Sequence, residues 1–192
     1  MQAFVEACNF YEYQSGDIVS PVISDHLRQK NEGLAVELLT EAFTYDERTQ
    51  NRFIIVPLVD DGYWVVVRVD RIHCKVIVAD PRELIVKHRH PLVKPLVNAL
   101  TKCKKRKWET EAIAVDDLPR SGEKLYSAIL ACLNIGCWAV FKNKKQLELQ
   151  LYTEVFTYST DNHFMAKARH FISRVIYEYG KRGQELVAVQ VV

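Results

Sequence analysis

The side chains in this sequence that are best suited to covalent catalysis are five cysteines: Cys8, Cys74, Cys103, Cys132 and Cys137. A cysteine thiolate can attack a carbonyl carbon when a neighbouring base, most often histidine, takes its proton. The count is odd and no pair has CxxC spacing, which favours reduced thiols in an intracellular protein over a disulfide framework. Among them Cys132 is the candidate nucleophile, although the almost wholly apolar segment 128–135 is typical of a helix interior.

His88 and His90, together with Cys103, are the residues that invite a search for a metal site. Their spacing matches no standard zinc pattern, and no fourth ligand stands out. The sequence also lacks a glycine-rich phosphate loop. We therefore predict neither a metal site nor a bound cofactor.

The most polarised segment, residues 84–108, contains eight Lys and Arg residues and no acid. It ends in a run of basic residues followed by Trp108, namely Lys102, Lys104, Lys105, Arg106 and Lys107. Such a run has three interpretations: a solvated helix end, a surface for an acidic protein partner, and contacts to nucleic-acid phosphates. A net charge of only +2 makes nucleic acid the third choice.

These residues must be positioned by secondary structure, and apolar spacing predicts helices over 1–45, including one within 17–30 and one within 33–43. An antiparallel meander is predicted over 52–80, where β-branched and aromatic residues dominate. Its strands are 53–59, 63–69 and 73–79, and Asp60-Asp61-Gly62 marks the first turn.

The second half of the chain is predicted to hold a basic helix (91–107), a strand (108–115) and a buried helix (121–140), then a helix (161–180) and a strand (184–192). We expect one α+β domain spanning 1–192, with a central, mostly antiparallel sheet flanked by helices. No apolar run is long enough to span a membrane, so no membrane association is expected. The apolar C-terminal strand is a candidate surface for homo- or hetero-oligomers.

The segment Arg52–Pro81, RFIIVPLVDDGYWVVVRVDRIHCKVIVADP, resembles the cysteine proteases that process SUMO and related ubiquitin-like proteins. In that family a His-Trp pair begins one strand, and an acid at the end of the next strand orients the histidine. Trp64 matches the family tryptophan and Asp80 the acid, but Tyr63 stands at the position of the base. Further on, AVDDLPRSGEKLYSAILACL is similar to the stretch that carries the catalytic cysteine, and Leu125 falls at its position.

The resemblance covers most of residues 16–140 and implies a papain-like fold without the protease chemistry. Tyrosine, with a pKa of about 10, is a poor proton acceptor at neutral pH, and leucine cannot attack a carbonyl. From the residues alone, Asp80 reads as a strand cap and Trp64 as a core residue; only the resemblance makes them site residues.

We therefore predict a catalytically inactive relative that serves as a protein-interaction or assembly module, with a ubiquitin-like protein or a complex subunit as its partner. The predicted binding residues are Tyr63, Trp64, Asp80, Lys102, Lys104, Lys105, Arg106 and Lys107. Two alternatives remain open: an active cysteine protease that uses Cys132, and a nucleic-acid-binding domain that uses residues 102–107.

Overall fold

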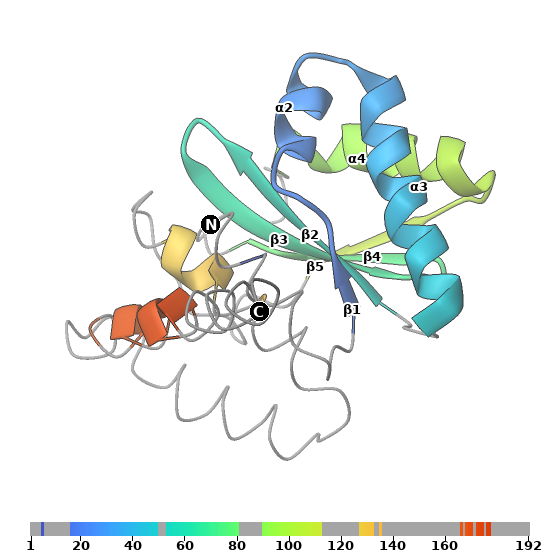
Figure 1. The fold of residues 1–192 in the computed structure, drawn as a ribbon. Coiled ribbons are helices and arrows are strands. Elements are labelled where there is room, and N and C mark those ends of the chain that lie inside the picture. The colour runs from blue at the N-terminus through green and yellow to red at the C-terminus, as the bar shows by residue number, and fades with distance from the viewer. Residues whose placement is uncertain are drawn as a thin grey trace, which may run out of the picture.

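A computed structural model describes residues 5, 16–49, 53–80, 90–112, 127–132 and 135, together with helical positions 166, 168–170, 172–174, 176 and 177. Its centre is a five-stranded sheet with the order β1-β2-β3-β4-β5 (Figure 1). The strands are β1 (Gly16–Ile18), β2 (Phe53–Asp60), β3 (Tyr63–Asp70), β4 (Lys75–Ala79) and β5 (Glu109–Ala112). The central pairs β2–β3 and β3–β4 are antiparallel, as the meander prediction required, whereas β1 and β5 join the two edges in parallel.

A two-residue turn connects β2 to β3. Both of its residues have positive φ, 48° at Asp61 and 74° at Gly62. Such a turn matches the right-handed twist of the flanking strands, and Asp-Gly is a preferred sequence for it. The turn predicted from the sequence is therefore confirmed.

The turn between β3 and β4 is wider than predicted. Asp70 is buried, and its Oδ1 accepts the backbone N–H groups of Ile72 and His73 at 3.1 Å each. This local capping holds the chain out of the extended conformation until Cys74, whose φ is 52°. Strand β4, the third strand of the predicted meander, consequently begins at Lys75, so the prediction that it begins at His73 was wrong by two residues.

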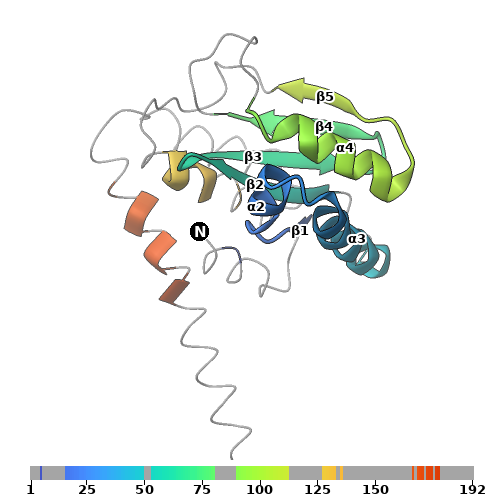
Figure 2. The same cartoon turned by 90° about the horizontal axis from the view of Figure 1, so that it is seen from above.

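Three helices cover one face of the sheet: α2 (Ile23–Arg28), α3 (Glu32–Thr49) and α4 (Val93–Lys104) (Figures 1 and 2). In α3 the buried residues Ala35, Leu39 and Phe43 recur every four positions, which places them on one side of the helix. Helix α4 tolerates Pro95 because it lies in the first turn, where an N–H has no helical partner. Alternate residues of the central strands meet these helices in the main core; they include Ile54, Val56, Leu58, Val65, Val67, Val69, Val76 and Val78.

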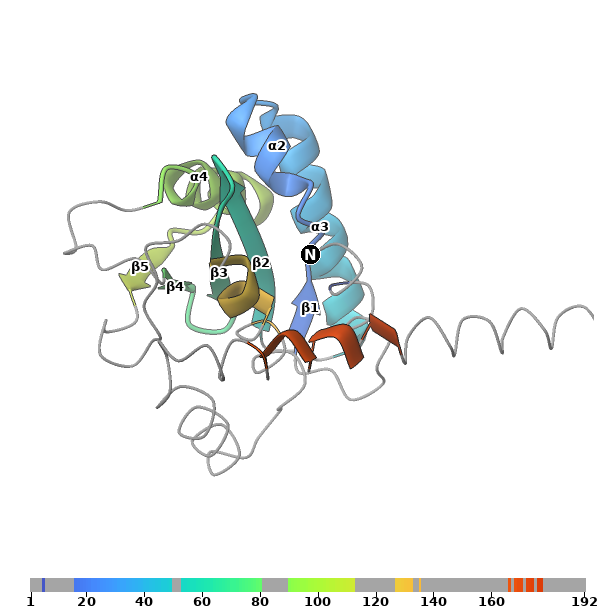
Figure 3. The same cartoon turned by 90° about the vertical axis from the view of Figure 1, so that its left-hand side faces the viewer.

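The opposite face of the sheet is also covered. Residues 127–132 are helical and lie on that side (Figure 3), with Ile129, Leu130 and Ala131 buried. Consistent with this, Ile55 and Val66, which fall between the core positions of β2 and β3, are fully buried as well. The predicted sheet flanked by helices is confirmed. None of the helices among the described residues is long and apolar enough to cross a membrane.

Helices were predicted over 1–45; the segment contains α2 and most of α3 as predicted, but also the strand β1, which was not predicted. Three residues, Gly-Asp-Ile, carry too little pattern to indicate a strand, and β1 exists because it pairs with Phe53–Ile55. Helix α2 is confined to Ile23–Arg28, within the predicted 17–30. The predicted strand 108–115 is observed as β5 over Glu109–Ala112, and the predicted strand 184–192 lies outside the described residues.

Pro57 sits in the middle of β2, a strand with neighbours on both sides, where proline normally removes a ladder hydrogen bond. The pairing with β1 ends opposite Ile55, so no ladder bond is lost at Pro57. Two residues on, the N–H of Val59 is taken by Ser24 Oγ of α2 at 3.0 Å. Proline thus marks where β2 changes partners from a strand to a helix.

Candidate functional site

Three of the predicted site residues lie at the same end of the sheet. Tyr63 and Trp64 begin β3, and Asp80 directly follows β4. Because Ala79 pairs with Val66, the chain returns Asp80 to the start of β3. Tyr63 is buried, with 8% of its surface exposed, whereas Trp64 and Asp80 are half-buried.

Ser127 ties this end of the sheet to the helix beneath it. The N–H of Trp64 donates a hydrogen bond to Ser127 Oγ at 3.0 Å, and Ser127 is fully buried. The pairing between β3 and β4 ends at Val66. Ser127 therefore accepts a hydrogen bond from a β3 amide that lies beyond the last residue paired with β4. Sequence reasoning missed Ser127, although a single hydroxyl in an apolar segment is a signal that it has a buried partner.

Leu125, predicted to stand at the nucleophile position, lies outside the described residues. Ser127 follows it by two residues along the chain and contacts Trp64, the neighbour of Tyr63. The segment that carries Leu125 therefore leads directly into the helix bound to the start of β3. The position of Leu125 itself stays a prediction.

Cys132 is in a poor environment for a nucleophile. Its residue surface is 6% exposed, and burial raises the pKa of its thiol to about 11. At physiological pH the group is consequently a neutral thiol, which attacks carbonyls far more slowly than a thiolate. Elsewhere among the described residues, Cys74 Sγ donates to Arg71 O at 4.0 Å, and Cys103 Sγ lies 3.3 Å from Thr40 Oγ1.

Helix α2 braces the β2–β3 hairpin beside Tyr63. Arg28 Nε donates to Asp60 Oδ1 at 3.2 Å, and Arg28 Nη2 donates to the carbonyl oxygen of Val59 at 2.6 Å. The hydrogen bond to Asp60 is the main reason that the pKa of Arg28 is raised. Asp60 is the strand partner of Tyr63, so these contacts hold the backbone in place where Tyr63 begins β3.

Of the two histidines considered as metal ligands, the structure describes His90. Within the described part of the chain, no cluster of three or more metal-ligating side chains occurs. His90 is buried, and its Nδ1 accepts the N–H of Leu92 at 3.4 Å. His88 lies outside the described residues, and His73 pairs with Asp70 at the end of β3 away from Tyr63.

The basic run 102–107 is split by the fold. Lys102 forms an ion pair with Glu32 of α3, and Lys104 lies over the ring of Phe43. Lys105 ends α4 in the left-handed conformation and is exposed, as are Arg106 and Lys107. All of them lie at the end of α4, away from the end of the sheet that holds Tyr63, Trp64 and Asp80. The alternative of a nucleic-acid surface stays a prediction.

Comparisons with known proteins reveal similarity in fold alone. No protein-family model matches the sequence, and no curated protein sequence matches it. Among solved structures, the chain resembles SUMO protease Ulp1 with its catalytic cysteine oxidised to a sulfonic acid, at 11% identity and a TM-score of 0.55, covering 91% of this chain and 72% of that one. It also resembles the C-terminal Ulp1 protease domain in complex with SMT3, the yeast ortholog of SUMO, at 10% identity and a TM-score of 0.56, covering 93% and 73%.

A third similar structure is the Ulp1-like SUMO protease catalytic domain of Chaetomium thermophilum, at 13% identity and a TM-score of 0.51, covering 87% of this chain and 72% of that one. Identities this low define the architecture and leave the activity open. The chain has the α+β, papain-like fold of the Ulp1-like SUMO proteases, as predicted from its sequence.

Proposed function

We propose that this chain is a catalytically inactive SUMO-protease-like domain that binds a ubiquitin-like protein. The observation that carries the proposal is the position of Tyr63 at the start of β3, next to Trp64 and close to Asp80. The resemblance places the catalytic base there. A phenol with an ordinary pKa of about 10 holds its proton at neutral pH and cannot activate a thiol.

The state of Cys132 supports the same proposal. A substitute nucleophile would need an exposed or charge-stabilised sulfur, and this thiol is buried in an apolar helix with its pKa raised. It also lies five residues beyond Ser127, which is already in contact with the start of β3. Burial therefore limits the access of a substrate to Cys132.

A binding role is supported by the partial exposure of Trp64 and Asp80 at the end of the sheet. The partly exposed aromatic ring of Trp64 would give an extended peptide apolar contact, and the carboxylate of Asp80 would accept its backbone N–H groups. One structure of similar fold was solved in complex with SMT3, the yeast ortholog of SUMO. The tail of a ubiquitin-like protein is accordingly the partner that we propose for this surface.

Covalent labelling tests the absence of protease activity. The full chain is incubated with SUMO and ubiquitin probes that carry a C-terminal electrophile, and adducts are detected by intact-mass spectrometry. The expected result is no adduct under conditions that fully label a Ulp1 protease domain. An adduct on the wild-type chain that disappears in Cys132→Ala would establish the active-protease alternative.

Binding is tested separately, by titrating the full chain with unmodified SUMO and ubiquitin in a calorimeter. Trp64→Ala should weaken binding about tenfold or more, as expected for an aromatic anchor. Ile72→Ala is the matched control, since Ile72 is an exposed apolar residue at the opposite end of β3. Equal affinities for the two variants, or no affinity of the wild-type chain for either protein, would refute this site.

A further inference from the structure

The outer surfaces of two neighbouring helices carry opposite charges. Helices α3 and α4 belong to the layer that covers one face of the sheet (Figure 2), and Thr40 of α3 contacts Cys103 of α4 at 3.3 Å. Over residues 32–44, α3 contains acidic residues and no basic one, whereas α4 contains lysines and no acid. One surface of the chain therefore presents both signs of charge, each on its own helix.

On α3 the outward charges are Glu37 and Glu41. Both are exposed, and they lie on the side of the helix opposite the buried residues Ala35, Leu39 and Phe43. They are four residues apart, so the two like charges lie one turn from each other and repel. The positions three and four residues away from either glutamate hold no lysine or arginine. The helix itself therefore provides no cation that relieves this repulsion.

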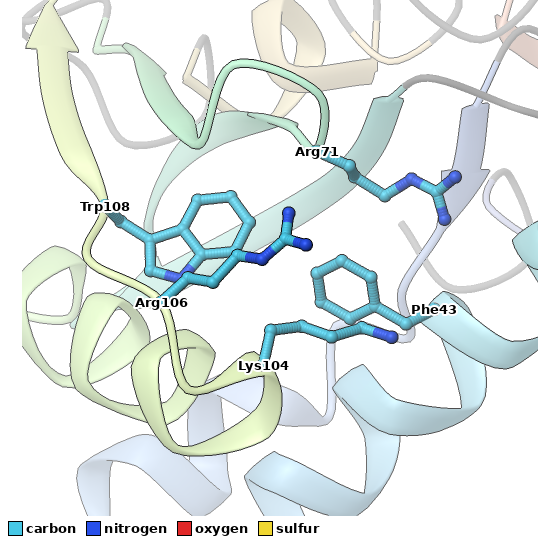
Figure 4. A pocket seen from close by; sticks show the side chains of 5 residues that line it. All are labelled: Phe43, Arg71, Lys104, Arg106 and Trp108. Carbon is cyan, nitrogen blue, oxygen red and sulfur yellow. The ribbon is translucent and has the colours of Figure 1, made fainter.

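On α4 the outward charges are Lys94 and Lys105. Both are exposed, and the exposed residues Asn98 and Thr101 lie between them at helical spacing, so the four form one row. Lys94 lies in the first turn of α4, where a cation opposes the helix dipole, and no acid is present in that turn. Lys104 is turned out of this row and lines a small pocket together with Phe43, Arg71, Arg106 and Trp108 (Figure 4).

The charges of the two helices are matched only in part within one chain. Lys102 of α4 forms an ion pair with Glu32 of α3 where the helices meet. Among the described residues, the four outward charges on α3 and α4 form no ion pair. Local choices that cost stability in the isolated chain are expected where a surface serves an interaction. Because this surface lies on the outer side of the helices, it is separate from the proposed binding site at the end of the sheet.

We propose that this surface binds the same surface of a second copy of the chain, in a two-fold dimer in which α3 of each copy lies against α4 of the other. A two-fold axis brings identical patches together, so a patch that holds both signs of charge is complementary to itself. The pairing relieves the repulsion on α3 and the opposed dipole of α4 at once, whereas a partner of one charge sign would relieve only one of them. Leu34, which is 41% exposed and lies three residues before Glu37, adds apolar contact.

Charge reversal tests this pairing. Glu37→Lys with Glu41→Lys makes the outward charges of both helices positive, and Lys94→Glu with Lys105→Glu makes them negative. By sedimentation equilibrium near about 0.05 M NaCl, the full wild-type chain should form dimers that dissociate as the salt is raised to about 1 M. Each variant alone should associate at least about tenfold more weakly, because like charges then face each other. An equimolar mixture of the two variants should recover the dimer, since one copy is then positive and the other negative.

Lys107→Glu with Arg169→Glu is the matched control, since both residues are exposed and lie outside α3 and α4. Its association should stay within about threefold of the wild type, and circular dichroism checks that every variant is folded. A monomeric wild type at low salt, reversal variants that weaken no more than the control, or a mixture that stays monomeric would overturn the proposal. So would assembly beyond the dimer, because an open series of contacts is heterologous and lacks the two-fold axis.

Discussion

The backbone N–H of Trp64 donates a hydrogen bond of 3.0 Å to the side chain of Ser127, a residue 63 positions further along the chain. This contact joins the first residues of β3 to the helix on the face opposite α2, α3 and α4. Both partners lie at the end of the sheet that also holds Tyr63 and Asp80. The hydrogen bond therefore sets the spacing between the strand and the helix at the candidate binding surface.

Replacing Ser127 with alanine should lower the free energy of unfolding by about 1–3 kcal/mol, since the amide of Trp64 would lose its buried acceptor. Urea denaturation measures the effect. Thr101→Ala is the control, because its exposed Oγ1 donates to the carbonyl oxygen of Val97 within α4 at 2.8 Å, and the change should stay near about 0.5 kcal/mol. Equal stability of the Ser127 variant and the wild type would contradict the role given to this contact.

Cys132 predicts a loss of stability at alkaline pH. Its thiol has a folded-state pKa of about 11, raised by burial from an ordinary value of 9.0. Between these values the unfolded chain releases the proton and the folded chain keeps it, so unfolding is favoured as the pH rises. The full effect is on the order of 2–3 kcal/mol and is absent below about pH 8.

The measurement compares urea denaturation of the wild type and Cys132→Ala at pH 7.5 and pH 10.5. Alanine removes the titrating group, so the wild type should lose about 2 kcal/mol more than the variant over this interval. Identical losses would show that the thiol ionises as easily in the folded chain as in the unfolded one. The buried, neutral state of Cys132 would then be wrong.

Two glycine positions should respond to alanine in opposite directions. Gly62 has a φ of 74° in the β2–β3 turn, so Gly62→Ala should destabilise the chain by about 1 kcal/mol. Gly33 lies in the first turn of α3, where an added Cβ meets only Asn31 Oδ1 at 3.9 Å. Gly33→Ala should therefore stabilise by about 0.5 kcal/mol, and thermal denaturation of both variants would show whether the signs differ.

Asp70→Ala should destabilise the chain by about 1–3 kcal/mol. The carboxylate is buried and accepts the N–H groups of Ile72 and His73, so its loss leaves the turn that carries Arg71 uncapped. His73→Ala removes the partly exposed contact between the imidazole and the Asp70 carboxylate and should cost less than about 1 kcal/mol. Chemical denaturation of both variants distinguishes the capping role from the contact with the imidazole.

The central strands could be predicted because their signals are local. β-branched residues fill β2 and β3, and Asp61-Gly62 specifies the turn between them. Strand β1 could not be predicted, because its three residues become a strand only through pairing with β2, some 35 residues away. The start of β4 was missed because the capping by Asp70 competes with extended backbone, and propensity does not reveal which wins.

The candidate site was predictable only in part, for the same reason. Tyr63, Trp64 and Asp80 were found through their fixed places in a resemblance that runs along the strands. Ser127 carries no motif, and its importance comes from one long-range contact. The basic run was visible, but nothing in the sequence links it to Phe43 and Arg71, which only the packing of α3 and the β3–β4 turn brings beside it.

Pro57 has a further consequence for how this chain meets its neighbours. Beyond Ile55 the outer side of β2 offers no N–H at Pro57, and the N–H of Val59 already belongs to Ser24. An intruding strand from another molecule would find no ladder to extend there. Pro57 therefore disfavours edge-to-edge aggregation of the β2–β3 hairpin, even in a partly folded chain in which α2 has not yet packed against β2.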